Sequence, residues 1–398
     1  MPSKKKSYNP LIMNFDYLKP IDDALLEYAK LQSGQSFGRC IEIYSAQNGF
    51  PELLNKKIAI VGVEEGRSAI GNQETGSNLN EIRKELYKLF PGNWPISVAD
   101  IGNIPQGNTI EDTYFALSEL LTWLIKNKII PIIIGGGQDL TYSNYRAYDK
   151  LEQTVNIVSV DNKFDLGTIE DDLTSQSFLS KIVMNQPNNL FNFSNIGYQT
   201  YFNSQNEIDL LDGLFFEAYR LGEVSSAIQL VEPVLRDADI VSIDLSAIKN
   251  ADAPANNNAT PNGFTGAEIC AISRYAGISD KVTSFGIYEY NPKFDIKNQT
   301  AQLISQMIWY FIEGVNYRAN DYPFGLKDNY QKYIVPIDNE VLNFYKSNKS
   351  GRWWMEINLI ESNKFKRHTL IPCAYQDYIS ATNQEIPDRW LKTLKKLV

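Results

Sequence analysis

The sequence predicts a three-layer α/β/α sandwich built around a mostly parallel, doubly wound sheet. Short apolar runs rich in β-branched residues recur along the chain, and amphipathic stretches of helical period lie between them. Most of these runs are continuously apolar rather than alternating, which is typical of parallel strands buried on both faces. Strand and helix alternate over roughly 270 residues, the pattern that produces a parallel sheet covered by helices on both sides.

The strands of this sheet are expected at seven apolar runs, namely residues 57–63, 96–101, 130–134, 155–160, 195–198, 240–245 and 283–288. Helices are expected at residues 21–31, 80–89, 111–128, 223–236 and 299–315, where apolar residues follow the helical period. A further helix is expected to begin at Thr265, because Glu268 three residues later completes a capping box. In doubly wound sheets ligands bind at the carboxyl ends of the strands.

The two ends of the chain lack this alternation. Residues 1–50 are expected to form an N-terminal extension that contains the first helix, and residues 51–322 the main α/β domain. Residues 323–398 are rich in Trp and Tyr and are expected to form a C-terminal extension packed on the main domain. Its aromatic side chains are interpreted as core or interface residues, which makes it a candidate surface for a protein partner or a second copy.

Composition excludes several classes of protein. The 398 residues carry a net charge of −9, which argues against a nucleic-acid partner. Neither an 18-residue apolar run nor a signal peptide is apparent, so no membrane association is expected. The three cysteines, Cys40, Cys270 and Cys373, are far apart, which indicates reduced core thiols and a cytoplasmic location. His368 is the single histidine and is expected at the surface, which excludes a Ser-His-Asp triad and a three-histidine zinc site.

Acidic residues stand where several predicted strands end. Asp161 and Asp165 follow one strand, Asp244 ends another, and Glu289 follows a third. Taken singly, the pair Asp161 and Asp165 is interpreted as a turn cap and Glu289 as a strand-end salt bridge or cap. Together they predict a cation at this edge, because crowded buried carboxylates repel one another. The cation is either a metal or an ammonium, and Lys163 lies within the cluster.

A glycine run, Gly135-Gly136-Gly137, follows the predicted strand 130–134 and precedes Gln138 and Asp139. Glycines allow the backbone to approach other groups closely, but this run is neither a GxGxxG nor a phosphate-binding loop. Gln138 is expected to present its amide to the same sheet edge. The run Asn256-Asn257-Asn258 is interpreted as a polar loop.

Four segments in this order resemble the arginase / agmatinase / formimidoylglutamase family, the ureohydrolases. Gly135–Asp139 resembles the segment GG[GD]H, and Asp161–Asp165 resembles DAHxD. The stretch from Ser242 through Ser246 to Thr265 resembles SxDxD…P…GG[LF]T, and Glu289-Tyr290-Asn291-Pro292 resembles E[VY]NP. The resemblance implies an arginase-like sandwich with two Mn²⁺ ions that activate water for attack on a guanidino or formimino carbon. It also implies that Glu289 contacts the cationic end of the substrate.

The departures from the family pattern lie at the metal ligands. Gln138 and Lys163 stand at the two histidine positions, and Ser246 stands at an aspartate position. The resemblance implies that Gln138, Asp161, Asp165 and Asp244 remain as ligands for one ion. These ligands are all oxygen atoms, which suit Mg²⁺, Ca²⁺ or weakly bound Mn²⁺. At the other ion, the Lys163 ammonium would repel a dication. We therefore expect one divalent cation or none, and not a two-manganese centre.

The resulting hypothesis is a family member with a degenerate dinuclear site and a non-hydrolytic role in ligand binding or protein interaction. Its cleft is expected to bind a small cationic or amide ligand through Glu289 and the Asp cluster. Asp161, Lys163 and Glu289 are the candidates for any remaining catalysis. The alternative is a divergent metal-dependent hydrolase of C–N bonds in a linear amidine such as formiminoglutamate, arginine or agmatine.

Overall fold

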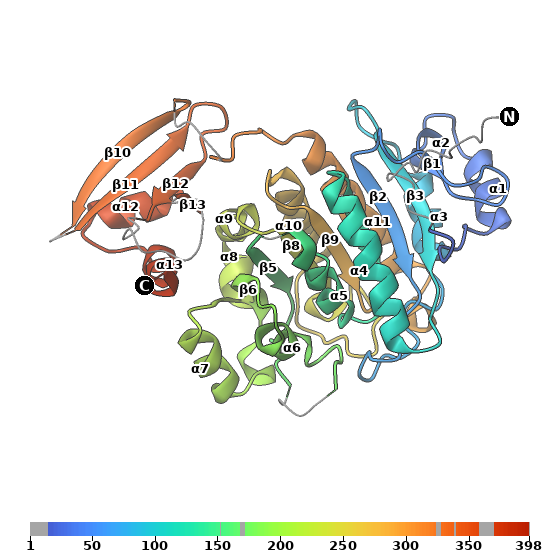
Figure 1. Cartoon of the computed structure of the whole chain (residues 1–398), viewed down its shortest axis with the longest axis horizontal. Coiled ribbons are helices and arrows are strands. Elements are labelled where there is room, and N and C mark those ends of the chain that lie inside the picture. Colours follow the sequence, from blue (N-terminus) through green and yellow to red (C-terminus); the bar gives the residue numbers. More distant parts are fainter. Residues whose placement is uncertain are drawn as a thin grey trace, which may run out of the picture.

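The computed structural model describes residues 15–151, 153–167, 172–323, 328–337, 340–357 and 370–397. It contains two sheets, which lie in different parts of the chain (Figure 1). The first has nine strands in the order β1-β3-β2-β4-β9-β8-β5-β6-β7, and the second has four in the order β10-β11-β12-β13. His368 lies outside the described residues.

All neighbouring strands of the nine-stranded sheet are parallel. The strands are β1 (Glu42–Ile43), β2 (Ile58–Val63), β3 (Val98–Ile104), β4 (Ile130–Ile134), β5 (Val155–Val160), β6 (Leu190–Tyr198), β7 (Glu217–Arg220), β8 (Ile240–Asp244) and β9 (Ser284–Tyr288). Every residue of β2, β4, β5, β8 and β9 is buried, as the continuously apolar runs predict.

Helices cover both faces of this sheet. One apolar core packs α3 (Asn80–Lys88), α8 (Leu221–Ser226), α9 (Glu232–Arg236), α10 (Gly266–Ile278) and α11 (Gln299–Asn316), together with α1 (Asp23–Leu31) and α2 (Phe37–Cys40). A second core, on the other face, packs α4 (Ile110–Lys126), α5 (Leu140–Arg146), α6 (Phe178–Met184) and α7 (Gln205–Gly213). The molecule is therefore the three-layer sandwich that the sequence predicts.

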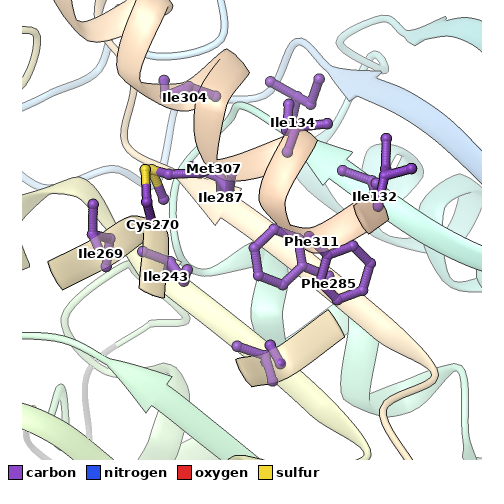
Figure 2. Close-up of a cluster of buried hydrophobic side chains, with 14 of the residues drawn as sticks. Ile132, Ile134, Ile243, Ile269, Cys270, Phe285, Ile287, Ile304, Met307 and Phe311 are labelled. Carbon is purple, nitrogen blue, oxygen red and sulfur yellow. The ribbon is translucent and has the colours of Figure 1, made fainter. Parts of the chain in front are cut away.

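The first of these cores shows how the layers interlock (Figure 2). Ile132 and Ile134 of β4 and Ile287 of β9 face α10 and α11, and the Phe285 ring stacks on Phe311 at 4.2 Å. Cys270 lies within this core, and Cys373 is also buried, but Cys40 is exposed on α2, so the expectation of three core cysteines is wrong for Cys40.

The structure corrects several element boundaries. The helix expected at residues 223–236 is divided into α8, a 3₁₀ turn and α9, because Pro233 has no N–H and can stand only in the first turn of α9. Strand β6 begins at Leu190 rather than residue 195. The apolar pattern predicts too short a strand because Asn192 and Ser194 interrupt it. Strands β1 and β7 were not predicted, because each is short and lies at an edge of the sheet.

The C-terminal residues form an antiparallel sheet with two helices. Its elements are β10 (Tyr330–Ile337), β11 (Glu340–Ser347), β12 (Trp353–Glu356), β13 (Leu370–Cys373), α12 (Tyr375–Thr382) and α13 (Asp388–Leu397). Trp353, Phe344 and Trp390 belong to a separate apolar core between this sheet and its helices. The domain boundaries at residues 50 and 322 stay a prediction.

Buried arginines join this extension to the main domain. Arg236 of α9 donates to the carbonyl oxygens of Trp353 (3.1 Å) and Cys373 (2.9 Å), and its guanidinium lies 4.5 Å from the centre of the Trp354 ring. Arg389 of α13 forms an ion pair with Glu217 of β7 at 3.3 Å. Since Glu217 begins β7 and Arg236 precedes β8, the contact lies at the amino ends of the strands.

In the described part of the chain, no helix has both the length and the apolar character needed to span a membrane.

Candidate functional site

A pocket of about 150 Å³ lies at the opposite edge, where adjacent strands β4, β9, β8 and β5 end. Six of the seven residues that the sequence singled out line it, and Gln138 lies directly behind the wall. The lining residues are Asp161, Asn162, Lys163, Asp165, Ser175, Gln176, Phe202, Asp244, Ser246, Asn258, Thr260 and Glu289.

The glycine run after β4 joins the end of this strand to that of β9. Gly136 has a φ of 75°, and a Cβ there would lie 2.7 Å from the carbonyl oxygen of Glu65, so only glycine fits. Its carbonyl oxygen accepts the backbone N–H of Glu289 at 2.9 Å. The close approach that the glycines permit therefore fixes the position of Glu289.

Glu289 is held rigidly at the bottom of the site. The backbone N–H of Gln138 donates to its Oε1 at 3.0 Å, and the Asn72 amide donates to its Oε2 at 2.8 Å. Burial raises the pKa of Glu289 to about 8, against the opposing effect of the Asn72 and Gln138 hydrogen bonds. The groups around Glu289 therefore do not stabilise its carboxylate enough to offset the cost of burying it.

Asp161 and Asp165 are brought together by the turn after β5. The Lys163 backbone N–H donates to Asp161 Oδ1 at 2.9 Å, and Asp165 has a φ of 53°, which turns the chain back. Burial raises the pKa of Asp161, and it raises that of Asp165 well above the usual range, where the Asp161 charge adds to the effect. The two carboxyl groups thus form a buried acid pair.

Asp244 completes the acidic lining from β8. Its Oδ1 accepts the backbone N–H of Ser246 at 2.6 Å and the Asn256 amide at 3.4 Å. Burial raises its pKa well above the usual range, and the charges of Asp161 and Glu289 raise it further. Ser246, which stands at an aspartate position of the family pattern, also lines the pocket.

Lys163 lines the pocket with a half-buried side chain. Its charge lowers the pKa values of Asp161 and Asp165, but less than burial raises them. Among the described residues no ion pair joins its ammonium to a carboxylate. The turn holds Lys163 through its backbone N–H and leaves the half-buried ammonium partly in solvent, so the ammonium that the sequence offered as the compensating cation forms no direct ion pair with these acids among the described residues.

Buried oxygen atoms at this edge that have no hydrogen-bond donor within the described chain include Gln138 Oε1, Asp161 Oδ2 and Asn162 Oδ1. Each of these belongs to a residue at most 2% exposed. The Gln138 amide nitrogen donates to Ser159 Oγ at 3.2 Å, which leaves the amide oxygen unused. A buried acceptor without a donor costs about 1 to 3 kcal/mol. These oxygen atoms are therefore available to accept hydrogen bonds.

The residues present do not fit the two-metal centre that the resemblance implies. An amide, an ammonium and a hydroxyl occupy three ligand positions, at Gln138, Lys163 and Ser246. In the ranges that the structure describes, no three His, Cys, Asp or Glu side chains are grouped so as to hold a metal ion. A one-ion site through Gln138, Asp161, Asp165 and Asp244 stays a prediction.

Several site residues were missed at the sequence level. Asn72 holds Glu289, Asn256 holds Asp244, and Asn258 lines the pocket and donates to the Ile70 carbonyl oxygen at 2.9 Å. The sequence of residues 256–258 predicts only a polar loop. Asparagine is common in ordinary turns, so its composition carries no signal that distinguishes a site from a loop.

Comparison with known proteins identifies the same fold. The model of the arginase family matches residues 56–313. The formimidoylglutamase of Staphylococcus haemolyticus (strain JCSC1435) is 27% identical over 261 residues, which cover 63% of this chain and 82% of that protein. The formimidoylglutamase of Staphylococcus carnosus (strain TM300) is 24% identical over 264 residues, with the same coverage.

Solved structures agree at the level of the fold. The formiminoglutamase of Trypanosoma cruzi, solved with Mn²⁺, has a TM-score of 0.61 at 18% identity and covers 67% of this chain and 96% of its own. The formimidoylglutamase of Bacillus subtilis has a TM-score of 0.61 at 17% identity, and the match covers 76% of this chain and all of the other. The residues that match the family model end before β10, so the C-terminal sheet lies outside the matched region.

Proposed function

The chain belongs to the arginase family, and from this premise we propose that it is a non-hydrolytic member whose pocket binds a small organic cation. The observation that carries the proposal is the set of buried acceptors Gln138 Oε1, Asp161 Oδ2 and Asn162 Oδ1, which have no donor in the described chain. They lie beside Asp244 and Glu289, whose pKa values are raised by burial and by like charges.

An amidinium or guanidinium ion suits this set for two reasons. It supplies several N–H donors in one plane, which satisfy carboxylate and amide oxygens together. It also supplies one positive charge, which offsets the repulsion among the acids. The pocket volume of about 150 Å³ accommodates only the cationic head of such a ligand.

The absence of hydrolysis follows from the ligand positions. In the family the two metal ions lower the pKa of the attacking water. Gln138 and Ser246 are neutral here and Lys163 is a cation, so these residues lack the charge to hold two dications. Asp161 and Glu289 would then serve to bind and orient the cation.

The test is calorimetric titration of the purified protein with guanidinium, acetamidinium and agmatine, together with an assay for urea or formamide release. We expect saturable binding without product release. Asp161→Asn removes the charge that faces the cation and should weaken binding about tenfold or more, since charged hydrogen bonds contribute about 1.5 to 3 kcal/mol. Asp23→Asn, at an exposed position on α1, is the control of equal charge change.

The alternative is a divergent metal-dependent hydrolase of linear amidines, as the names of the curated relatives suggest. Turnover of formiminoglutamate, arginine or agmatine, or two bound Mn²⁺ ions per chain, would overturn the non-hydrolytic proposal. A protein partner or a second copy bound through the C-terminal extension stays a proposal, which light scattering of the purified protein would test.

A further inference from the structure

A second cavity, of about 540 Å³, adjoins the small pocket. The two share four lining residues, Lys163, Asp165, Gln176 and Phe202. The larger cavity therefore opens from the position of the proposed cation, and any ligand longer than its cationic head extends into it.

The larger cavity has an apolar side. Ile70 and Phe202 line it and are 42% and 37% exposed, and Tyr201, which is 66% exposed, packs edge-on against Phe202 with ring centres 4.7 Å apart. Exposed apolar surface at the mouth of a polar pocket is unfavourable in water and is typical of ligand contact.

These apolar side chains are held in place by the backbone. The Ile70 N–H donates to Ser175 Oγ at 3.0 Å, and the Ile70 carbonyl oxygen accepts the Asn258 amide at 2.9 Å. The Phe202 N–H donates to the Gln199 carbonyl oxygen at 2.9 Å. Because Ser175 and Asn258 also line the small pocket, both cavities are built on one set of contacts.

The charges of the larger cavity disfavour an anionic tail. Asp165, Asp172 and Glu207 line it, against the single ammonium of Lys163 among the described lining residues. A carboxylate on the ligand would lie among like charges, whereas an apolar group meets Ile70 and Phe202 without that cost.

We propose that the larger cavity binds the apolar body of the ligand, so that the ligand class is an aryl- or alkyl-amidinium rather than a zwitterionic amino acid. This inference rests on the proposed function, because it requires the cationic head to occupy the small pocket. Ile70 and Phe202 then determine specificity for the body, while Asp161 and Glu289 bind the head.

Three probes test the proposal by calorimetric titration of the full chain: acetamidinium, benzamidinium and L-arginine. Benzamidinium should bind at least about tenfold more tightly than acetamidinium, because the ring buries apolar surface against Phe202. L-Arginine should bind more weakly than benzamidinium. Equal affinity for acetamidinium and benzamidinium, or tighter binding of L-arginine, would overturn the inference and leave the proposed function intact. If none of the three binds, the proposed function fails.

Variants locate the contact. Phe202→Ala should remove the advantage of benzamidinium over acetamidinium, measured as the ratio of the two affinities within the variant. Phe115→Ala, at a 67% exposed position on α4 outside both cavities, is the matched control and should change neither affinity. If Phe202→Ala retains the full advantage, the apolar body does not bind there and the inference is wrong. The probe series on the unaltered protein decides the question even if a variant fails to fold.

Discussion

The two ends of the nine-stranded sheet treat buried charge in opposite ways. At the amino ends, where the C-terminal extension packs, Glu217 is paired with Arg389, and Arg236 is paired with Glu232 at 3.2 Å. At the carboxyl ends, Asp161, Asp165, Asp244 and Glu289 are buried, and among the described residues that line the pocket the half-buried Lys163 is the one cation. Both regions are crowded with ionisable groups, but in the part of the chain that the structure describes the first region pairs its acids more fully.

The pKa shifts express the same difference. Burial acts to raise the pKa of Glu217, but Arg389 and Lys396 outweigh it, and the net pKa is lowered. In the pocket, burial raises the pKa values of Asp165 and Asp244, and neighbouring acids raise them further. Glu217 thus has opposite charges that offset its burial, whereas the acids of the pocket do not, and this contrast is what motivates the proposed cationic ligand.

The largest effect is expected from Arg236→Ala in the interface. It removes the donor to two carbonyl oxygens, one of the two arginines that pair with Glu232, and the contact with Trp354. The free energy of unfolding should fall by about 3 kcal/mol, as for other buried pairs that lose one member. Urea denaturation measures this. Arg274→Ala, in a partly exposed pair with Glu313, is the control and should cost less than about 1 kcal/mol. Equal losses would show that the interface is no better paired than the surface.

A smaller effect is expected from Glu217→Gln, and it depends on pH. Since the folded pKa of Glu217 lies below its usual value of 4.5, the stabilisation is present above that pH and is lost as the pH falls through the folded pKa. At pH 7 the variant should be less stable by about 1.5 to 2 kcal/mol, in the lower part of the range of about 1.5 to 3 kcal/mol for hydrogen bonds to charged groups. Denaturation at pH 7 and pH 3 should show this difference shrinking in acid. A difference that is constant with pH would contradict the pairing of Glu217.

In the pocket, replacing an acid should raise the free energy of unfolding rather than lower it. Asp244→Asn relieves repulsion with Asp161 and Glu289, while its amide oxygen can still accept the Ser246 N–H. The free energy of unfolding should rise by about 1 kcal/mol, and affinity for acetamidinium should fall. Thermal denaturation and calorimetric titration measure the two effects. Loss of stability comparable to that of Glu217→Gln would mean that the pocket acids already have sufficient counter-charge.

The smallest change in the free energy of unfolding is expected when metal is added or removed. Addition of Mn²⁺ or of a chelator should change the free energy of unfolding by less than about 0.5 kcal/mol, whereas a metal at a hundredfold excess over its Kd would contribute about 2.7 kcal/mol. Thermal denaturation with and without Mn²⁺ measures this. The triple variant Gln138→His, Lys163→His, Ser246→Asp restores the family ligand types and should gain Mn²⁺-dependent stability. A Mn²⁺ effect in the unaltered chain as large as that in the triple variant would contradict the prediction that no two-manganese centre forms.

The sequence alone determined the fold and the identity of the site acids. Continuous apolar runs at residues 130–134, 155–160 and 240–245 predict buried parallel strands, because such runs have no polar face to expose. The acids that follow these strands meet at one sheet edge, since parallel strands end there together. The resemblance then marked Gln138, Lys163 and Ser246 as departures from a metal-binding pattern.

Only the tertiary structure decided which of these charges have partners. Arg236 and Glu217 have no special sequence context, yet residues 117 and 172 positions away supply their partners, Trp353 and Arg389. Lys163 lies beside the acids in sequence, but the turn keeps its ammonium out of direct contact with them. Coulomb interactions depend on distance and burial in space rather than on spacing along the chain. The packing of distant segments therefore determined that Glu217 and Arg236 have partners of opposite charge, and that the described acids of the pocket form no ion pair with Lys163.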